Sequence, residues 1–373
     1  MKLQRSLIVA TTILSTLSLA SCKKPVVIDL AYGSIENSLK EIDYTQLTTM
    51  VNDEDSFILA ITSSSLGCGC WSTFKNNILL PYQNENHVLV YYINHQEFYD
   101  ASQKLMNTYG LTITQDPGFA LFNKGELKYS ETYSSKNFIF SKMEYFKEYM
   151  QDKVKLPNTF YLSKEQLDNF YKGNEEFTVM FSRNNCGDCK YVLKNYLLEF
   201  ALNNKKSEKP LYILECEDVE VTVGYNTVKL REYDAEGNLT EASSTRWANF
   251  KNEYGLSNVN NPTFGYDAGS VPTFIHVQPD GTNKTGSVIK DQAVYFNDAV
   301  SQVDGKYVVT NSYYTNERAA NLTYLGDVKT KVLKGLEIPA SDVSAFGEYI
   351  SWNHDAAEKY HTPLLKAFLT KYC

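Results

Sequence analysis

Two cysteines separated by two residues, Cys186 and Cys189, form the pair whose type and spacing point most directly to chemistry. If the first cysteine lies at the start of a helix, free backbone N–H groups and the positive end of the helix dipole stabilise its thiolate. The second cysteine then lies one turn further on, close enough to the first to close a disulfide. The spacing therefore indicates two thiols that can switch between a reduced and a disulfide form.

The sequence on either side of the pair predicts the strand and the helix that would position it. Residues 177–181 are mostly β-branched and aromatic, which is typical of a buried strand. After the pair, Val192, Tyr196 and Phe200 recur at four-residue spacing and define one apolar face of a helix. We therefore expect the cysteines where a strand turns into a helix.

Half of a zinc site is the alternative interpretation of such a pair. A structural zinc site needs two further ligands, usually from a second closely spaced pair of Cys or His residues. The only other close cysteine pair in the sequence is Cys68 and Cys70, and the order of the predicted elements assigns it to a different domain. We therefore expect neither a metal nor another cofactor.

A second motif follows in residues 269–281: a Val271-Pro272 step, a short apolar strand and a Pro-Asp-Gly turn. Together with the cysteine pair, it resembles the thioredoxin family over residues 157–290. Proteins of that family have a cis-proline at the start of a strand opposite their Cys-x-x-Cys. The resemblance implies that Pro272 is this cis-proline and that the backbone of Val271 pairs with an extended substrate segment.

The resemblance also implies a role for each cysteine. Cys186 would attack a substrate disulfide, and Cys189 would resolve the mixed disulfide that forms. Lys190 stands where members of the family often have Lys, and its charge would favour the thiolate.

Three residues depart from thioredoxin itself. Asp188 replaces a proline between the cysteines and adds a negative charge that opposes the helix dipole. Met180 stands where thioredoxin has a buried Asp, so the usual proton shuttle for the resolving cysteine is missing. Asn185, directly before the pair, replaces a Trp. These changes affect the expected efficiency and redox potential more than the type of reaction.

The composition is that of a globular protein. The 373 residues are 43% hydrophobic and 21% charged, and the chain is long enough for two or three domains with real cores. The formal net charge is −8, and no basic stripe is present, which argues against a nucleic-acid partner.

The first 22 residues have the pattern of a targeting segment. Lys2 and Arg5 give a charged start, residues 7–19 are apolar but too short for a membrane span, and Leu-Ala-Ser precedes Cys22. This pattern looks like a bacterial lipobox, which implies that Cys22 is lipidated and becomes the mature N-terminus; an ordinary signal peptide is the alternative. We expect a lipid anchor in the membrane, a protein on its extracytoplasmic side, and a polar spacer over 23–40.

The seven cysteines fit that compartment, where disulfides persist. If Cys22 is lipidated and the two close pairs each form a disulfide, Cys216 and Cys373 remain. We predict that these two form a long-range structural disulfide.

The predicted elements occur twice in the same order: strand, helix, strand, cysteine site, helix, strand, helix and X-Pro strand. An internal repeat of about 120 residues is the simplest explanation. We therefore predict an α/β protein with two thioredoxin-like domains, at 41–153 and 157–373, each with a central mixed β-sheet flanked by helices.

The first domain has a candidate second redox site, made of Cys68, Cys70 and Pro117. Its cysteines are separated by only one residue, so their disulfide would close a smaller and more strained ring. Asp116 precedes the proline, which is unusual for the family. A structural copy without turnover is the alternative for this domain.

The second domain contains two stretches that a minimal thioredoxin lacks. Residues 219–240 predict a hairpin that turns at 234–238, and residues 291–353 contain further strands before a final helix over 355–372. We interpret both stretches as insertions, with a small third domain as the alternative for 291–353.

The predicted function is that of a membrane-anchored, extracytoplasmic thiol–disulfide oxidoreductase whose substrates are protein or peptide thiols and disulfides. The competing hypothesis is a non-enzymatic binding lipoprotein that uses thioredoxin-like domains as a scaffold. His276 lies on the strand after Pro272, and we expect a core or surface histidine without a catalytic role.

Overall fold

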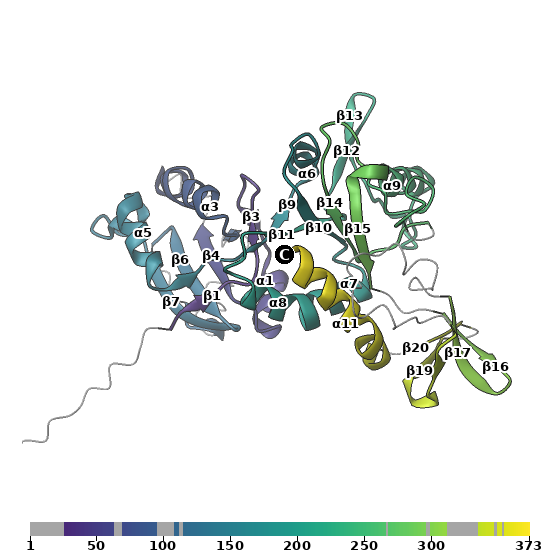
Figure 1. Ribbon diagram of the computed structural model, residues 1–373. Helices are drawn as coiled ribbons and strands as arrows, with labels where there is room; N and C mark the ends of the chain where they lie inside the picture. The colour runs from purple at the N-terminus through teal and green to yellow at the C-terminus, as the bar shows by residue number, and fades with distance from the viewer. Residues whose placement is uncertain are drawn as a thin grey trace, which may run out of the picture.

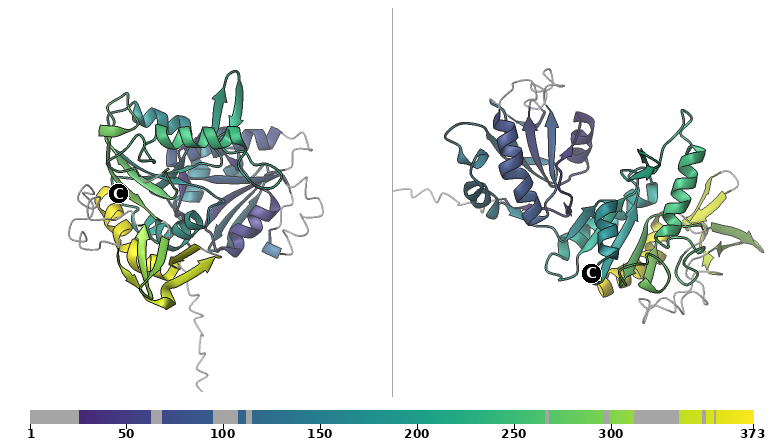
Figure 2. Two further views of the ribbon diagram at one scale, coloured as in Figure 1. Left: turned by 90° about the vertical axis from the view of Figure 1, so that its right-hand side faces the viewer. Right: turned by 90° about the horizontal axis from the view of Figure 1, so that it is seen from above.

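The computed structural model describes residues 26–62, 69–94, 108–111, 115–265, 268–295, 299–311, 335–346, 349–352 and 354–373. It contains two sheets of the same topology, which form separate lobes, and a third sheet lies beyond the second lobe (Figures 1 and 2). The predicted α/β fold with two thioredoxin-like domains is therefore confirmed.

The strand order of the first sheet is β3-β5-β4-β6-β7. Strands β3, β5 and β4 are parallel, β6 is antiparallel to β4, and β7 is antiparallel to β6. These strands are β3 (Lys40–Glu41), β4 (Phe57–Thr62), β5 (Val90–Asn94), β6 (Gly118–Asn123) and β7 (Glu126–Thr132).

The second sheet repeats this order as β9-β11-β10-β14-β15, with the same strand directions. Its central strand β10 is buried along its whole length, because helices cover both faces of the sheet. The strands are β9 (Thr159–Leu162), β10 (Phe177–Ser182), β11 (Leu211–Glu215), β14 (Thr273–Val277) and β15 (Ile289–Val294).

The helices also repeat. The first helix of each domain begins with a capping box, formed by Asp43 with Gln46 and by Ser163 with Gln166. The cysteine-bearing helix of each domain contains a π-helical turn, η2 or η5. The first domain has α1 (Tyr44–Asn52), α2 (Gly69–Phe74), η2 (Lys75–Leu79), α3 (Leu80–Asn86), η4 (Phe138–Phe140) and α5 (Met143–Gln151). The second has α6 (Lys164–Tyr171), α7 (Gly187–Val192), η5 (Leu193–Leu197), α8 (Leu198–Asn203), α9 (Glu241–Glu253), η6 (Gly286–Val288) and α11 (His354–Tyr372).

The segment 23–40 differs from the expected spacer wherever it is described. Strand β1 (Ile28–Asp29) pairs with β8 (Val154–Lys155), and β2 (Gly33–Ser34) adds a sixth strand to the second sheet beside β9. The backbone N–H of Ser34 also donates to the carbonyl of His87 in the first domain (3.0 Å). Ile28 is fully buried. Ile28 and Leu30 therefore contribute to the core of the first domain. The segment from β1 to β2 connects the two lobes.

The first predicted insertion is a hairpin, but its predicted turn is wrong. Strands β12 (Glu220–Val223) and β13 (Asn226–Lys229) are joined at Gly224 and Tyr225. Residues 234–238 form a separate turn, closed by backbone N–H groups that donate to the Asp234 carboxylate. Gly224 adopts a positive φ of 64°, which suits a tight two-residue hairpin turn.

The second predicted insertion begins later than expected, because residues 291–294 belong to the core strand β15. Beyond β15 the chain forms a separate five-stranded sheet in the order β18-β17-β16-β20-β19. The chain then returns to the core through α11, whose Phe368 is fully buried and which contacts β15. The outer sheet consists of β16 (Ala299–Val303), β17 (Lys306–Asn311), β18 (Glu337–Ile338), β19 (Val343–Phe346) and β20 (Tyr349–Trp352), with the short helical turn η8 (Ala340–Asp342).

Within the described residues, no helix is both long enough and apolar enough to span a membrane. The sequence also predicts a helix from Glu97 to Tyr109, and most of it falls within residues 95–107, outside the described ranges.

Candidate dithiol site

Cys186 is the N-cap residue of α7, in the loop that follows β10. Its backbone is extended (φ −96°, ψ 125°), and its Sγ atom accepts a hydrogen bond from the backbone N–H of Cys189 (3.4 Å). This sulfur therefore takes the place of the side-chain oxygen that caps most helices, and it faces the positive end of the helix.

The two thiols differ in access to solvent. Both are free in this structure, but Cys186 is partly exposed and Cys189 is buried. An external reactant therefore reaches Cys186 first.

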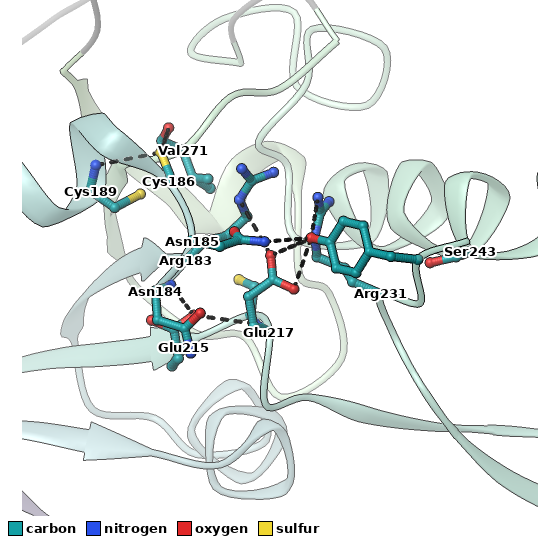
Figure 3. Close-up of polar contacts among 12 residues, drawn as sticks. Arg183, Asn184, Asn185, Cys186, Cys189, Glu215, Glu217, Arg231, Ser243 and Val271 are labelled. Carbon is teal, nitrogen blue, oxygen red and sulfur yellow. Dashed lines mark hydrogen bonds and ion pairs between the residues drawn. The ribbon is translucent and has the colours of Figure 1, made fainter. Parts of the chain in front are cut away.

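The Val271–Pro272 peptide bond is cis and lies against the cysteine pair. The Sγ atom of Cys186 is 3.6 Å from the carbonyl oxygen of Val271 (Figure 3). Residues separated by about eighty positions in the sequence therefore meet at one site, in the arrangement that the thioredoxin resemblance implied.

The surroundings of Cys186 favour its thiolate and lower its pKa to about 6. The largest cause is the hydrogen bond from the Cys189 thiol, and the Cys189 backbone N–H and the Arg183 guanidinium act in the same direction. Partial burial and the Asp188 carboxylate oppose these effects. The pKa of Cys189 is raised, chiefly because its thiol donates to Cys186 and because it is buried.

Arg183 follows β10 and supplies a positive charge that lowers the pKa of Cys186, although no motif in the sequence points to it. Lys190, which we expected to do so, is exposed on α7. Met180, at the position of the thioredoxin Asp, is fully buried in the core.

Glu215, at the end of β11, is a second group that the sequence analysis missed. Its carboxylate accepts hydrogen bonds from the backbone N–H groups of Asn184 (2.8 Å) and Glu217 (3.2 Å). Burial nevertheless raises its pKa to about 7, and the charges of Asp218 and Glu217 add to this effect. A carboxyl group that titrates near neutrality therefore holds the loop that leads to Cys186.

The predicted disulfide between Cys216 and Cys373 is wrong, because both thiols are free. Cys216 bonds through its backbone N–H to Ser182, at the end of β10, whereas the carbonyl of Tyr372, next to Cys373, accepts from Thr178 near the start of that strand. Four residues of strand span roughly 13 Å. Two cysteines can be bridged only if their Cα atoms lie within about 7 Å.

The candidate site of the first domain is described only in part. Cys70 lies in the first turn of α2 and is disulfide-bonded, but Cys68 lies outside the described residues. The Asp116–Pro117 peptide bond is cis, as is its counterpart in the second domain.

His276 is a core histidine in this structure. Its ring stacks on Tyr372 (3.9 Å between centroids), and its Nδ1 atom lies 3.1 Å from the Thr178 hydroxyl. Burial lowers its pKa to about 4. Among the described residues, no group of three or more His, Cys, Asp and Glu side chains is arranged to hold a metal ion.

Comparison with known proteins gives similarities to solved structures alone. No protein-family model matches the chain, and no curated protein matches its sequence. A mutant thioredoxin from Halobacterium salinarum NRC-1 is 16% identical, over 32% of this chain and 94% of that one, with a TM-score of 0.25. Human ERp44 is 14% identical, over 48% of this chain and 44% of its own, with a TM-score of 0.23. The first two thioredoxin domains of Saccharomyces cerevisiae Eps1p are 13% identical, over 68% of this chain and 91% of that one, with a TM-score of 0.21.

The fold assignment depends on the repeated strand order and directions, since similarities at this level carry no argument of their own. The chain has two thioredoxin-like domains, a scaffold of the type that thiol–disulfide oxidoreductases use. Its second domain places two free thiols beside a cis-proline.

Proposed function

We propose that the protein is a thiol–disulfide oxidoreductase that acts on protein or peptide disulfides through Cys186 and Cys189. The observation that carries this proposal is the position of Cys186: a partly exposed thiol with a lowered pKa, at a helix N-terminus and against the cis Val271–Pro272 peptide. Such a thiol is a thiolate at neutral pH and is therefore a ready nucleophile.

In the reducing direction, the Cys186 thiolate attacks one sulfur of a substrate disulfide. A mixed disulfide forms, and the other substrate sulfur leaves as a thiolate that takes up a proton. Cys189 then loses its proton and attacks the Cys186 sulfur. The intramolecular disulfide closes, the second substrate thiol is released, and two electrons have passed from the protein to the substrate.

The raised pKa of Cys189 suits this order of events. Its largest cause is the hydrogen bond to Cys186. In the mixed disulfide Cys186 carries no negative charge, so this cause is removed. Cys189 therefore becomes a stronger acid at the step in which it must lose its proton, even though Met180 supplies no carboxylate.

Val271 and Pro272 are the proposed substrate-binding residues. Pro272 has no backbone N–H, and the side chains of both residues are uncharged. An extended substrate backbone that pairs along Val271 would bring its disulfide to Cys186.

We also propose that Cys22 is lipidated and holds the protein on the extracytoplasmic side of a membrane, because the N-terminal segment has the pattern of a lipobox. Two features support Cys68, Cys70 and Pro117 as a second redox site in the first domain: the disulfide of Cys70 and the cis Asp116–Pro117 peptide.

The test is reduction of a protein disulfide, such as those of insulin, by the pre-reduced protein from residue 23 onward. Turnover with a dithiol as electron donor is expected. If the reduced protein has no activity but binds peptides, it is a binding protein on a thioredoxin-like scaffold.

A further inference from the structure

The hydroxyl group of Tyr233 is the centre of a polar cluster beside the dithiol loop. Its partners Asn185, Glu217 and Arg231 are labelled in Figure 3. It donates to the Glu217 carboxylate (2.9 Å to Oε1) and accepts from Asn185 Nδ2 (2.7 Å) and from Arg231 Nη2 (3.1 Å). A phenol hydroxyl has one proton to donate and two lone pairs. The hydroxyl can therefore bond to all three partners at once.

Packing fixes the far side of the cluster. Arg231 is buried, its guanidinium lies 4.8 Å from the Trp247 ring, and its Nε atom donates to Glu217 Oε1 (2.8 Å). Arg231 and Tyr233 follow β13, and Glu217 precedes β12, so the segments that flank the inserted hairpin supply all three charged or phenolic groups.

The near side of the cluster is the dithiol loop itself. Asn185 immediately precedes Cys186, and Arg183, which lowers the pKa of Cys186, lies 3.6 Å from Glu217 Oε1 through its Nε atom. Glu217 is closer to Arg231 than to Arg183, by 2.8 Å against 3.6 Å. The carboxylate therefore makes its shorter contacts with Arg231 and Tyr233 and pairs with Arg183 at a longer distance, which leaves the charge of Arg183 only partly neutralised.

We propose that Tyr233 is a positioning residue, which holds Asn185 next to the nucleophile and keeps Glu217 away from Arg183, and that the inserted hairpin thereby sets the reactivity of Cys186. This inference rests on the proposed function, in which Cys186 is the nucleophile. The groups that act on the Cys186 charge are Arg183, Asp188 and Cys189, and Arg183 is connected to the cluster through Glu217.

Two substitutions in the cluster should act in opposite directions. Tyr233→Phe removes the donor to Glu217, so the carboxylate moves toward Arg183 and the Cys186 thiolate loses support. Glu217→Gln removes the charge that competes for Arg183, so the thiolate gains support. If the two substitutions merely loosened the loop, both would shift the pKa of Cys186 in the same direction.

The experiment measures the rate of iodoacetamide alkylation of Cys186 against pH in the reduced full chain. Tyr233→Phe should move the midpoint up by roughly 0.5 pH unit, and Glu217→Gln should move it down. Tyr225→Phe is the matched control, because Tyr225 is a fully exposed tyrosine at the tip of the same hairpin. Its midpoint should equal that of the wild type.

The inference is overturned if the alkylation midpoint of Tyr233→Phe coincides with those of the wild type and Tyr225→Phe. This outcome can be read even if Glu217→Gln fails to fold because Arg231 is left buried and unpaired. Alkylation does not require turnover. A wild type that shows these shifts but reduces no disulfide would keep the inference and contradict the proposed function.

Discussion

The sulfur of Cys186 lies 3.6 Å from the carbonyl oxygen of Val271, the residue whose peptide bond to Pro272 is cis. The nucleophile therefore lies beside a stretch of backbone that an extended peptide can pair with, and the buried Cys189 lies behind it. The partly exposed sulfur of Cys186 is consequently placed to attack a substrate, and the buried sulfur of Cys189 is placed to resolve the mixed disulfide.

This division predicts different outcomes for two serine substitutions. Cys186→Ser should abolish disulfide reduction, whereas Cys189→Ser should accumulate mixed disulfides through Cys186, because the resolving thiol is missing. Non-reducing electrophoresis after reaction with a substrate disulfide measures both outcomes. Cys373→Ser removes a free, buried thiol elsewhere in the domain and is the control. Trapping in Cys186→Ser rather than in Cys189→Ser would reverse the two roles.

The pH dependence of Cys186 should reveal the charge that supports its thiolate. Because its pKa is lowered to about 6, alkylation of the wild type should be half-maximal near that pH and decrease below it. Arg183→Gln should raise the midpoint by roughly 0.5 pH unit. Lys190→Gln is the matched control and should shift it less, since Lys190 is exposed. A larger shift in Lys190→Gln than in Arg183→Gln would mean that Lys190 supports the Cys186 thiolate, as the sequence predicted.

Glu215 should make stability depend on pH. The folded state raises its pKa from 4.5 to about 7, so the folded protein binds this proton more tightly than the unfolded chain does. The stabilisation from protonated Glu215 is complete below about pH 4.5 and is lost as the pH rises through about 7. Its full size is up to roughly 3 kcal/mol.

Glu215→Gln keeps an acceptor for the Asn184 N–H but has no charge to bury. Urea unfolding at pH 5 and pH 8 should therefore show a smaller loss of stability in the variant than in the wild type. If both proteins lost the same stability between pH 5 and pH 8, a group other than Glu215 would be responsible for the pH dependence.

The first domain should contribute little to turnover. Replacement of both Cys68 and Cys70 by Ser should leave most of the insulin-reducing activity, because Cys186 and Cys189 remain intact. Loss of activity as large as that from Cys186→Ser would instead indicate a relay of electrons between the two domains.

Lipidation of Cys22 predicts a defined mature N-terminus. Mass spectrometry of the protein expressed in a bacterial host should show a modified Cys22, and Cys22→Ala should move the protein from the membrane fraction to the soluble fraction. Cleavage at another position would contradict the assignment.

The repeated fold was predictable from the sequence because its signals are local. The apolar runs of β4 and β10, and the Gln residues of the capping boxes at Asp43 and Ser163, identify strands and helix starts without any knowledge of tertiary contacts. Both X-Pro steps were recognised on the same basis.

The contacts around the thiols depend on tertiary structure, which residue spacing does not encode. The hydrogen bond from Asn185 to Tyr233 joins residues 48 positions apart. Tyr233 lies in the insertion at 219–240, whose turn was predicted at the wrong position. Cys216 and Cys373 were paired by elimination, and strand β10 separates them. Strands β1 and β2 have only two residues each, too few to show a period, so both were missed.

Those two strands determine how far the protein can stand from a membrane. If Cys22 carries the lipid, only Lys23, Lys24 and Pro25 separate it from Val26, and strand β1 begins at Ile28. Three extended residues reach roughly 10 Å. The first domain, in which the Val26 carbonyl accepts a hydrogen bond from the Tyr129 hydroxyl of β7, would then lie against the lipid headgroups without a stalk. Substrates would have to come to that surface, and a longer linker inserted after Lys24 would extend the reach of Cys186.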